Sequence, residues 1–93
     1  MFITKKEFLT RSGLQVQTLE FWVQREWVIP EETPSGPGFS DADVARAHLI
    51  RELSENVGAN EAGIDVILHL LDQLHGMRRG FEQVRSHLAK KEN

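Results

Sequence analysis

The stretch GLQVQTLEFWV, residues 13–23, decides the fold, because it contains a helix stop followed at once by an amphipathic helix. Gly13 suits the left-handed conformation that is common just past the end of a helix. From Leu14 to Trp27 apolar residues recur at spacings of three and four, which predicts a second helix with one buried face. The residues of that face are Val16, Leu19, Trp22, Val23 and Trp27.

The segment before this stretch carries a helix start. Thr4-Lys5-Lys6-Glu7 has the S/T-x-x-E pattern of a capping box, in which a hydroxyl and a carboxylate satisfy free backbone N–H groups. It predicts a first helix of about two turns that ends at Gly13. This helix should turn Phe8 and Leu9 toward the core.

The segment after the stretch predicts a wing. Val28-Ile29, ahead of Pro30, is too short for a helix and predicts a brief strand. The run EETPSGPG, residues 31–38, is rich in proline and glycine and predicts a turn or wing. Phe39 should return from it as a second short strand.

A third helix is predicted from Ser40 to about Ser54, because Ser40 and Asp43 have the spacing of a helix cap. Its inner face comprises Val44, Ala47, Ile50 and Leu53. Val57-Gly58 is a break, after which Asn60 can cap a last helix that has Glu61 in its first turn.

The last helix carries a long apolar seam. Its residues follow the 3-4 spacing of a coiled coil, and they are Ile67, Leu70, Leu74, Met77, Phe81, Val84 and Leu88. A helix of about 30 residues spans ~45 Å and would overhang so small a body. We therefore predict a homodimer paired through this seam. The alternative is a helix that folds back at Gly76 or Gly80 and leaves a monomer.

Length and composition limit the classes of function. A chain of 93 residues forms one domain, here with a body at 1–58 and the long helix at 59–93. The absence of cysteine excludes disulfides, thiolate metal sites and thiol nucleophiles. No stretch resembles a signal peptide or a membrane span, so we expect a cytoplasmic protein. The net charge of -3 argues against strong phosphate binding.

The order of elements and several short stretches resemble the winged helix-turn-helix of MerR-type transcription regulators. The matching stretches are Phe2-Ile3-Thr4, residues 13–23 and Gly38-Phe39-Ser40-Asp41-Ala42-Asp43-Val44. The resemblance implies a mainly α fold, a winged helix-turn-helix followed by a long C-terminal coiled-coil helix. It also implies that this helix pairs antiparallel with a second copy.

The departures from that family fall on the chemistry of DNA binding. Glu20 stands where the family's recognition helix carries Arg, and Phe21 stands where it carries Tyr. The wing carries Glu31 and Glu32 in place of arginines, and Arg25 is the only cation between residues 15 and 38. Since contacts to phosphate position a protein on DNA, we expect DNA binding to be weak or absent. If a DNA-binding role holds nevertheless, its candidate contacts are Gln15, Gln17, Thr18 and Arg25.

The run GIDVILHLLD, residues 63–72, is similar to that of CbpM-type chaperone modulators, a branch with a MerR-like fold. This resemblance implies an adaptor that binds the J-domain of a DnaJ-like co-chaperone and inhibits it without catalysing a reaction. The alternative is a MerR-family DNA-binding transcriptional regulator.

Two acidic surfaces are candidates for binding a basic J-domain. The helix-turn-helix surface comprises Glu20, Glu31 and Glu32, with Phe21 as an apolar anchor, and the last-helix strip comprises Glu61, Asp65 and Asp72. The three residues of the strip share one side of the helix, because successive residues turn by ~100°.

We expect no metal, cofactor or catalytic site. His69 and His75 are ~240° apart around a helix, so Asp72 cannot converge with both on one ion. The four histidines are scattered, and nothing in their spacing indicates an acid-base pair in a pocket.

Overall fold

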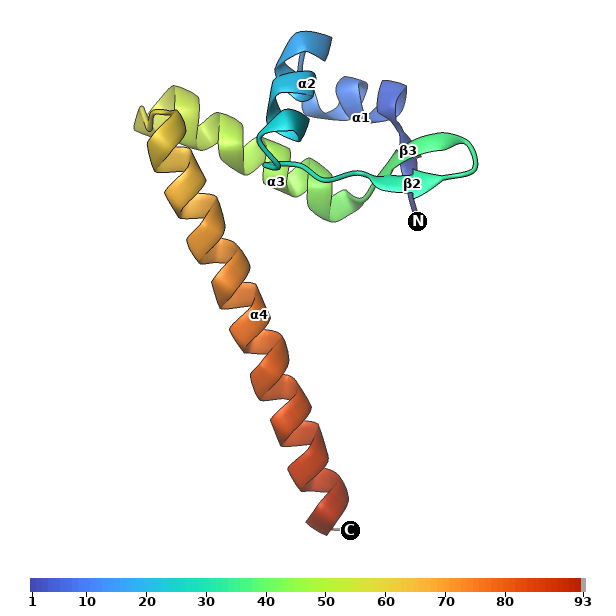
Figure 1. The fold of residues 1–93 in the computed structure, drawn as a ribbon, viewed down its shortest axis with the longest axis vertical. Helices are drawn as coiled ribbons and strands as arrows, with labels where there is room; N and C mark the ends of the chain where they lie inside the picture. Colours follow the sequence, from blue (N-terminus) through green and yellow to red (C-terminus); the bar gives the residue numbers. More distant parts are fainter. Residues whose placement is uncertain (93) are drawn as a thin grey trace. The chain divides into compact units, whose positions relative to one another are not determined.

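The computed structural model describes residues 1–92, with side chains described through residue 90. The fold is mainly helical and divides into two compact units, Met1–Asn60 and a single helix that begins at Glu61 (Figure 1). In chain order the elements are β1 Ile3–Thr4, α1 Lys5–Ser12, α2 Val16–Gln24, β2 Glu31–Thr33, β3 Gly36–Phe39, α3 Asp41–Glu52, the π-helix η1 Leu53–Val57 and α4 Glu61–Glu92. The first unit is a winged helix-turn-helix, in which α1 and α2 form the helix pair and β2 and β3 form the wing.

Helix α1 begins and ends where the sequence predicts. The Thr4 hydroxyl accepts a hydrogen bond from the Glu7 N–H at 3.2 Å. Gly13 has a φ of 73° and donates its N–H to the Leu9 carbonyl, which closes the helix. Phe8 is fully buried, whereas Leu9 is only half-buried, so the prediction that both turn into the core is right for Phe8 alone.

Helix α2 is shorter than predicted at both ends. It ends at Gln24 because Glu26 adopts a left-handed conformation with a φ of 60°. The Glu26 N–H donates to the Val23 carbonyl and the Trp27 N–H to the Trp22 carbonyl, which together form a Schellman motif. Trp27 therefore lies beyond the helix, although it is buried as predicted.

The predicted inner face of α2 is wrong at one position. Leu19 and Trp22 are buried, but Val16 is 44% exposed. Val16 is the first helical residue, and at that end the helix presents it to solvent rather than to the core. Val23 is half-buried.

We expect Glu26→Gly to raise the free energy of unfolding by about 0.5 to 1 kcal/mol. Glu26 occupies the left-handed position after a helix where glycine carries no steric cost. Urea unfolding of both proteins measures the difference. Glu26→Ala is the matched control, because it removes the same carboxylate and keeps the strained Cβ. A gain for Glu26→Ala equal to that for Glu26→Gly would contradict the backbone explanation.

The wing occupies the predicted segment, but its first strand begins three residues later than predicted. The strand is Glu31–Thr33 rather than Val28-Ile29, which is wrong as a strand assignment. Thr33 pairs with Gly36 across a two-residue turn, and the ladder ends at the pair Glu31–Gly38. Val28 is instead fully buried in the core.

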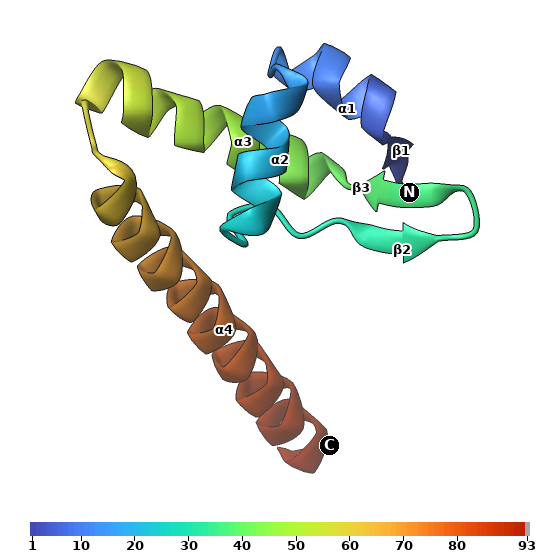
Figure 2. The same ribbon diagram turned by 45° about the horizontal axis from the view of Figure 1, so that its top comes forward.

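The strand β1, which the sequence did not predict, completes a three-stranded antiparallel sheet in the order β1-β3-β2 (Figure 2). Ile3 pairs with Phe39, the return strand that the sequence did predict. A Cβ on Gly38 would lie 2.9 Å from the Phe2 Cβ, so β1 can approach β3 only where this residue is glycine.

Helix α3 completes the first unit. Ser40 and Asp43 form the predicted cap as a full capping box, since each side chain accepts the other residue's backbone N–H. Ala47 and Ile50 are buried, and the stacked rings of Phe8 and Phe39, with centroids 4.3 Å apart, lie in the same core. The helix continues into η1, and Gly58 ends it with a φ of 80°, at the predicted break.

Helix α4 is continuous over 32 residues and passes through Gly76 and Gly80 without interruption. The alternative of a chain that folds back at either glycine is therefore wrong. At 1.5 Å per residue the helix is ~48 Å long. None of the helices in residues 1–92 combines the length and the apolar character needed to cross a membrane.

Candidate partner-binding surfaces

The exposed side of α2 carries a carboxylate at its centre. The Glu20 side chain is 64% exposed, and its Oε1 lies 3.9 Å from Lys5 Nζ at the start of α1. Sequence reasoning missed Lys5, because only the packing of α1 and α2 brings residues this far apart in the chain together. The pair is solvated on both sides, so its contribution to stability is small.

The glutamates of the wing do not share one face. Glu31 and Glu32 are both exposed in β2. Because successive side chains of a strand point to opposite faces, each face of the wing receives one carboxylate. The turn between β2 and β3 consists of Pro34 and Ser35, so it adds no positive charge.

The cation of this region is held on aromatic rings. The Arg25 guanidinium lies 5.8 Å from the Phe21 ring centroid and 5.6 Å from that of Trp27. Phe21 in turn packs edge-on against Trp27, with centroids 5.8 Å apart. Phe21 is therefore half-buried, and a positive charge lies over its ring.

Three of the four candidate DNA contacts lie at the start of α2, and the fourth, Arg25, is the C-cap residue at its other end. Gln15 and Gln17 are exposed, and Gln15 is the N-cap residue but forms no side-chain cap hydrogen bond. Thr18 is half-buried and, with Gln15, lines a cleft of about 280 Å³ that Trp22 and Arg51 also border. Gln15, Gln17 and Thr18 are uncharged, so they can supply hydrogen bonds but no phosphate neutralisation.

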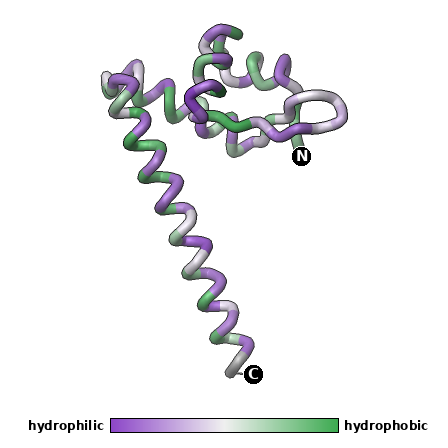
Figure 3. Tube along the Cα trace, in the orientation of Figure 1, coloured by the Kyte–Doolittle hydropathy of each residue, from purple (hydrophilic) through white to green (hydrophobic). Residues whose placement is uncertain are grey.

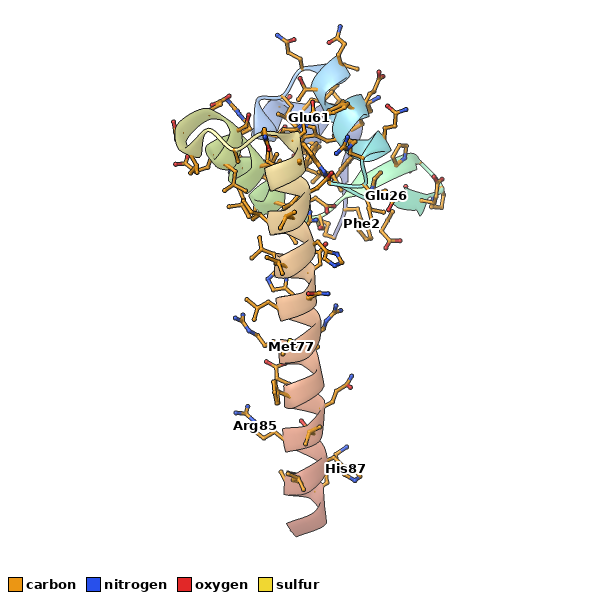
Figure 4. The ribbon with its side chains drawn as sticks, turned by 60° about the vertical axis from the view of Figure 1, so that its left-hand side comes forward. Phe2, Glu26, Glu61, Met77, Arg85 and His87 are labelled. Atoms are coloured by element: carbon orange, nitrogen blue, oxygen red, sulfur yellow. The ribbon has the colours of Figure 1, made fainter. Side chains whose placement is uncertain are left out.

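The second acidic surface lies on α4. Glu61 and Asp72 are exposed and Asp65 is half-buried. In Figure 4 Glu61 is labelled at the start of the helix. The strip occupies the first half of α4, which carries no lysine or arginine before Arg78.

The seam of α4 is largely open to solvent. Figure 3 shows apolar residues recurring along the helix with polar residues between them. Ile67 is half-buried, and the other six positions are 49% to 71% exposed, namely Leu70, Leu74, Met77, Phe81, Val84 and Leu88. A groove of about 290 Å³ runs along Leu74, Met77 and Phe81, and it is bordered by Arg78, Glu82 and Arg85. Arg85 and His87 project to opposite sides of the helix (Figure 4).

The histidines and carboxylates of the described residues form no group of three or more that could hold a metal ion. His69 lies near Gln73, 3.3 Å from its amide nitrogen, in an exposed contact one helical turn away.

Comparison with models of known protein families matches residues 3–86 to the family described as MerR HTH family regulatory protein. No curated protein matches the chain. No solved structure matches it either. The matched segment takes in the helix pair, the wing, α3 and most of α4.

Proposed function

The chain belongs to the MerR helix-turn-helix family, and we propose that it acts as an adaptor of the chaperone-modulator type rather than as a DNA-binding regulator. In this proposal it binds the basic J-domain of a DnaJ-like co-chaperone through its helix-turn-helix surface and inhibits that co-chaperone without catalysis. The observation that carries the proposal is the exposed Glu20 at the centre of α2.

Charge favours a protein partner over DNA at this surface. Residues 15–38 contain the carboxylates Glu20, Glu26, Glu31 and Glu32, against Arg25 alone. Half or more of the hydrogen bonds between proteins and DNA go to phosphate and sugar, and a carboxylate repels that backbone. The same carboxylates attract a basic protein surface, and this attraction speeds association and fixes the orientation of the partner.

Three observations favour DNA binding as the second candidate. The matched family is one of regulatory proteins, and Lys5 partly offsets the charge of Glu20. Gln15 and Gln17 are also exposed at the start of α2, where a glutamine amide can form a bidentate contact with adenine.

A direct titration distinguishes the two candidates. The protein is used to recover partners from the source cell, and a recovered J-domain protein and a 20-base-pair duplex are then each titrated by calorimetry. We expect saturable binding of the J-domain protein and no heat with the duplex at physiological salt. Recovery of promoter DNA with no J-domain protein would overturn the adaptor proposal.

We further propose that two copies pair through the α4 seam. The six exposed apolar side chains offer ~1.5 to 3 kcal/mol each on full burial, and a second copy supplies an identical seam of the same length. Charge favours the antiparallel arrangement, because the acidic first half of α4 would lie beside the half that carries Arg78, Arg79 and Arg85. A parallel pair would place like charges together.

A further inference from the structure

Helix α3 contacts the chain at both ends of α2. Arg51 Nη1 donates a hydrogen bond to the Ser12 carbonyl at 2.8 Å, just before the turn that leads into α2. Arg46 Nε donates to the Trp27 carbonyl, just after the Schellman motif that ends α2. Figures 1 and 2 both show α2 crossing α3.

At the first end α2 has no side-chain cap, and Arg51 instead holds the turn before it through the carbonyl of the last residue of α1. Ser12 is buried, and its Oγ accepts the Leu14 N–H at 3.3 Å, so this residue fixes the turn on one side. Its carbonyl belongs to the last turn of α1, where the helix provides no N–H group to donate to it. The Arg51 guanidinium meets that need and adds a positive charge at a helix C-terminus.

Arg51 is itself held in place. Its Nε lies 3.7 Å from Glu55 Oε1 in the π-helix η1. A Cβ on Gly13 would come within 2.9 Å of Arg51 Nη1, so the glycine also leaves room for the guanidinium. The turn, α3 and η1 therefore meet at one side chain.

The second end is strained and is also held from α3. Glu26 adopts a left-handed backbone conformation at the end of α2. This conformation is unfavourable for a residue with a Cβ. Trp27 follows Glu26, buried between the Phe21 and Trp22 rings, with centroids 5.8 Å and 6.2 Å away. The Arg46 contact fixes the Trp27 carbonyl at the point where the chain leaves α2 for the wing.

We propose that Arg51 and Arg46 are positioning residues for the partner-binding surface, each fixing one end of α2. Together they set how α2 presents Glu20 relative to the wing, although neither lies on the exposed side of α2. The effect on partner affinity rests on the proposed function, whereas the effect on the ends of α2 does not.

Amide hydrogen exchange of the full chain tests the two ends separately. In Arg51→Ala we expect exchange at Leu14 and Leu19 to accelerate about tenfold or more, as for loss of a hydrogen bond from a charged donor. In Arg46→Ala the same acceleration should appear at Glu26 and Trp27 instead. Arg51→Lys keeps a donor for the Ser12 carbonyl and should restore most of the protection at Leu14 and Leu19.

Arg11→Ala is the matched control. Arg11 is a cation of the same unit whose side chain pairs with Glu7 at 3.1 Å and Asp41 at 3.5 Å and makes neither of the two contacts at the ends of α2. It should leave exchange at both ends unchanged. Equal acceleration at both ends in either α3 variant would show a loss of overall stability only, and it would overturn the proposal, as would no acceleration at all.

Two further measurements keep the test decisive. If Arg51→Ala does not fold, Glu55→Gln removes the ion pair with Arg51 while leaving the guanidinium, and a few-fold acceleration confined to Leu14 and Leu19 is expected. Affinity for the J-domain protein should fall several-fold in Arg51→Ala and recover in Arg51→Lys. Exchange that changes as expected with no J-domain binding in any variant would overturn the proposed function and leave the positioning role intact.

Discussion

Phe81→Asp should convert a homodimer into folded monomers and raise the dimer dissociation constant by about a thousandfold or more. Phe81 is 71% exposed in the second half of the α4 seam, and in a symmetric pair the substitution places two carboxylates in the apolar contact. Burying an unpaired charge costs several kcal/mol even after relaxation, and the apolar contribution of the ring is lost as well.

Light scattering at tens of micromolar measures this effect. The wild-type chain should have a mass near twice 10.6 kDa, and Phe81→Asp should have a mass near 10.6 kDa with an unchanged helical spectrum. Ser86→Asp is the matched control, because it adds the same charge on α4 at an exposed position outside the seam. A monomeric wild type would rule out pairing through the seam.

Phe81 can be lost from the seam without loss of the fold because the first unit has its own core. Phe8, Phe39, Ala47 and Ile50 are buried within residues 1–60. In the single chain most of the seam side chains are exposed rather than packed. The free energy available from burying these side chains is large relative to a typical domain stability of ~5 to 15 kcal/mol. We therefore expect a second copy to cover the seam.

The features that could be predicted from the sequence are those fixed by short-range chemistry. The Thr4 and Ser40 caps and the Gly13 stop each depend on residues within one helical turn, so a local pattern suffices. The seam is likewise a periodicity of one helix, and α4 is continuous as the spacing indicates. The winged helix-turn-helix architecture was predicted through the resemblance to MerR-type regulators, and the structure has it.

The features that could not be predicted depend on contacts between distant segments. The wing strand is Glu31–Thr33 rather than the predicted Val28-Ile29. Its register is set by the turn, and Val28 is buried in the core. The contact of Arg51 with Ser12 spans 39 residues, and no local pattern indicates it. The pair of Lys5 and Glu20 also joins residues that are distant in the chain. A charge count limited to residues 15–38 therefore overstated the negative charge around α2.

Reversing the charge of the helix-turn-helix surface should exchange one binding activity for another. In the triple variant Glu20→Arg, Glu31→Arg and Glu32→Arg, we expect affinity for a basic J-domain to fall about a hundredfold or more, since like charges across an interface cost several kcal/mol. Non-specific affinity for duplex DNA should appear at the same time. Each arginine that meets a phosphate releases counterions, so the log of that affinity should fall with log salt at a slope of about -2 to -3.

The acidic strip of α4 supplies the matched control for this variant. Glu61→Arg, Asp65→Arg and Asp72→Arg change the net charge by the same amount at the other candidate surface. If the helix-turn-helix surface binds the J-domain, the α4 variant should keep most of its affinity and gain less DNA binding. A loss of J-domain affinity in the α4 variant alone would transfer the partner to that strip. Micromolar binding of duplex DNA by the wild-type protein at physiological salt would instead show that Glu20 does not prevent phosphate contact. Lys5 and the glutamines of α2 would then suffice for binding DNA.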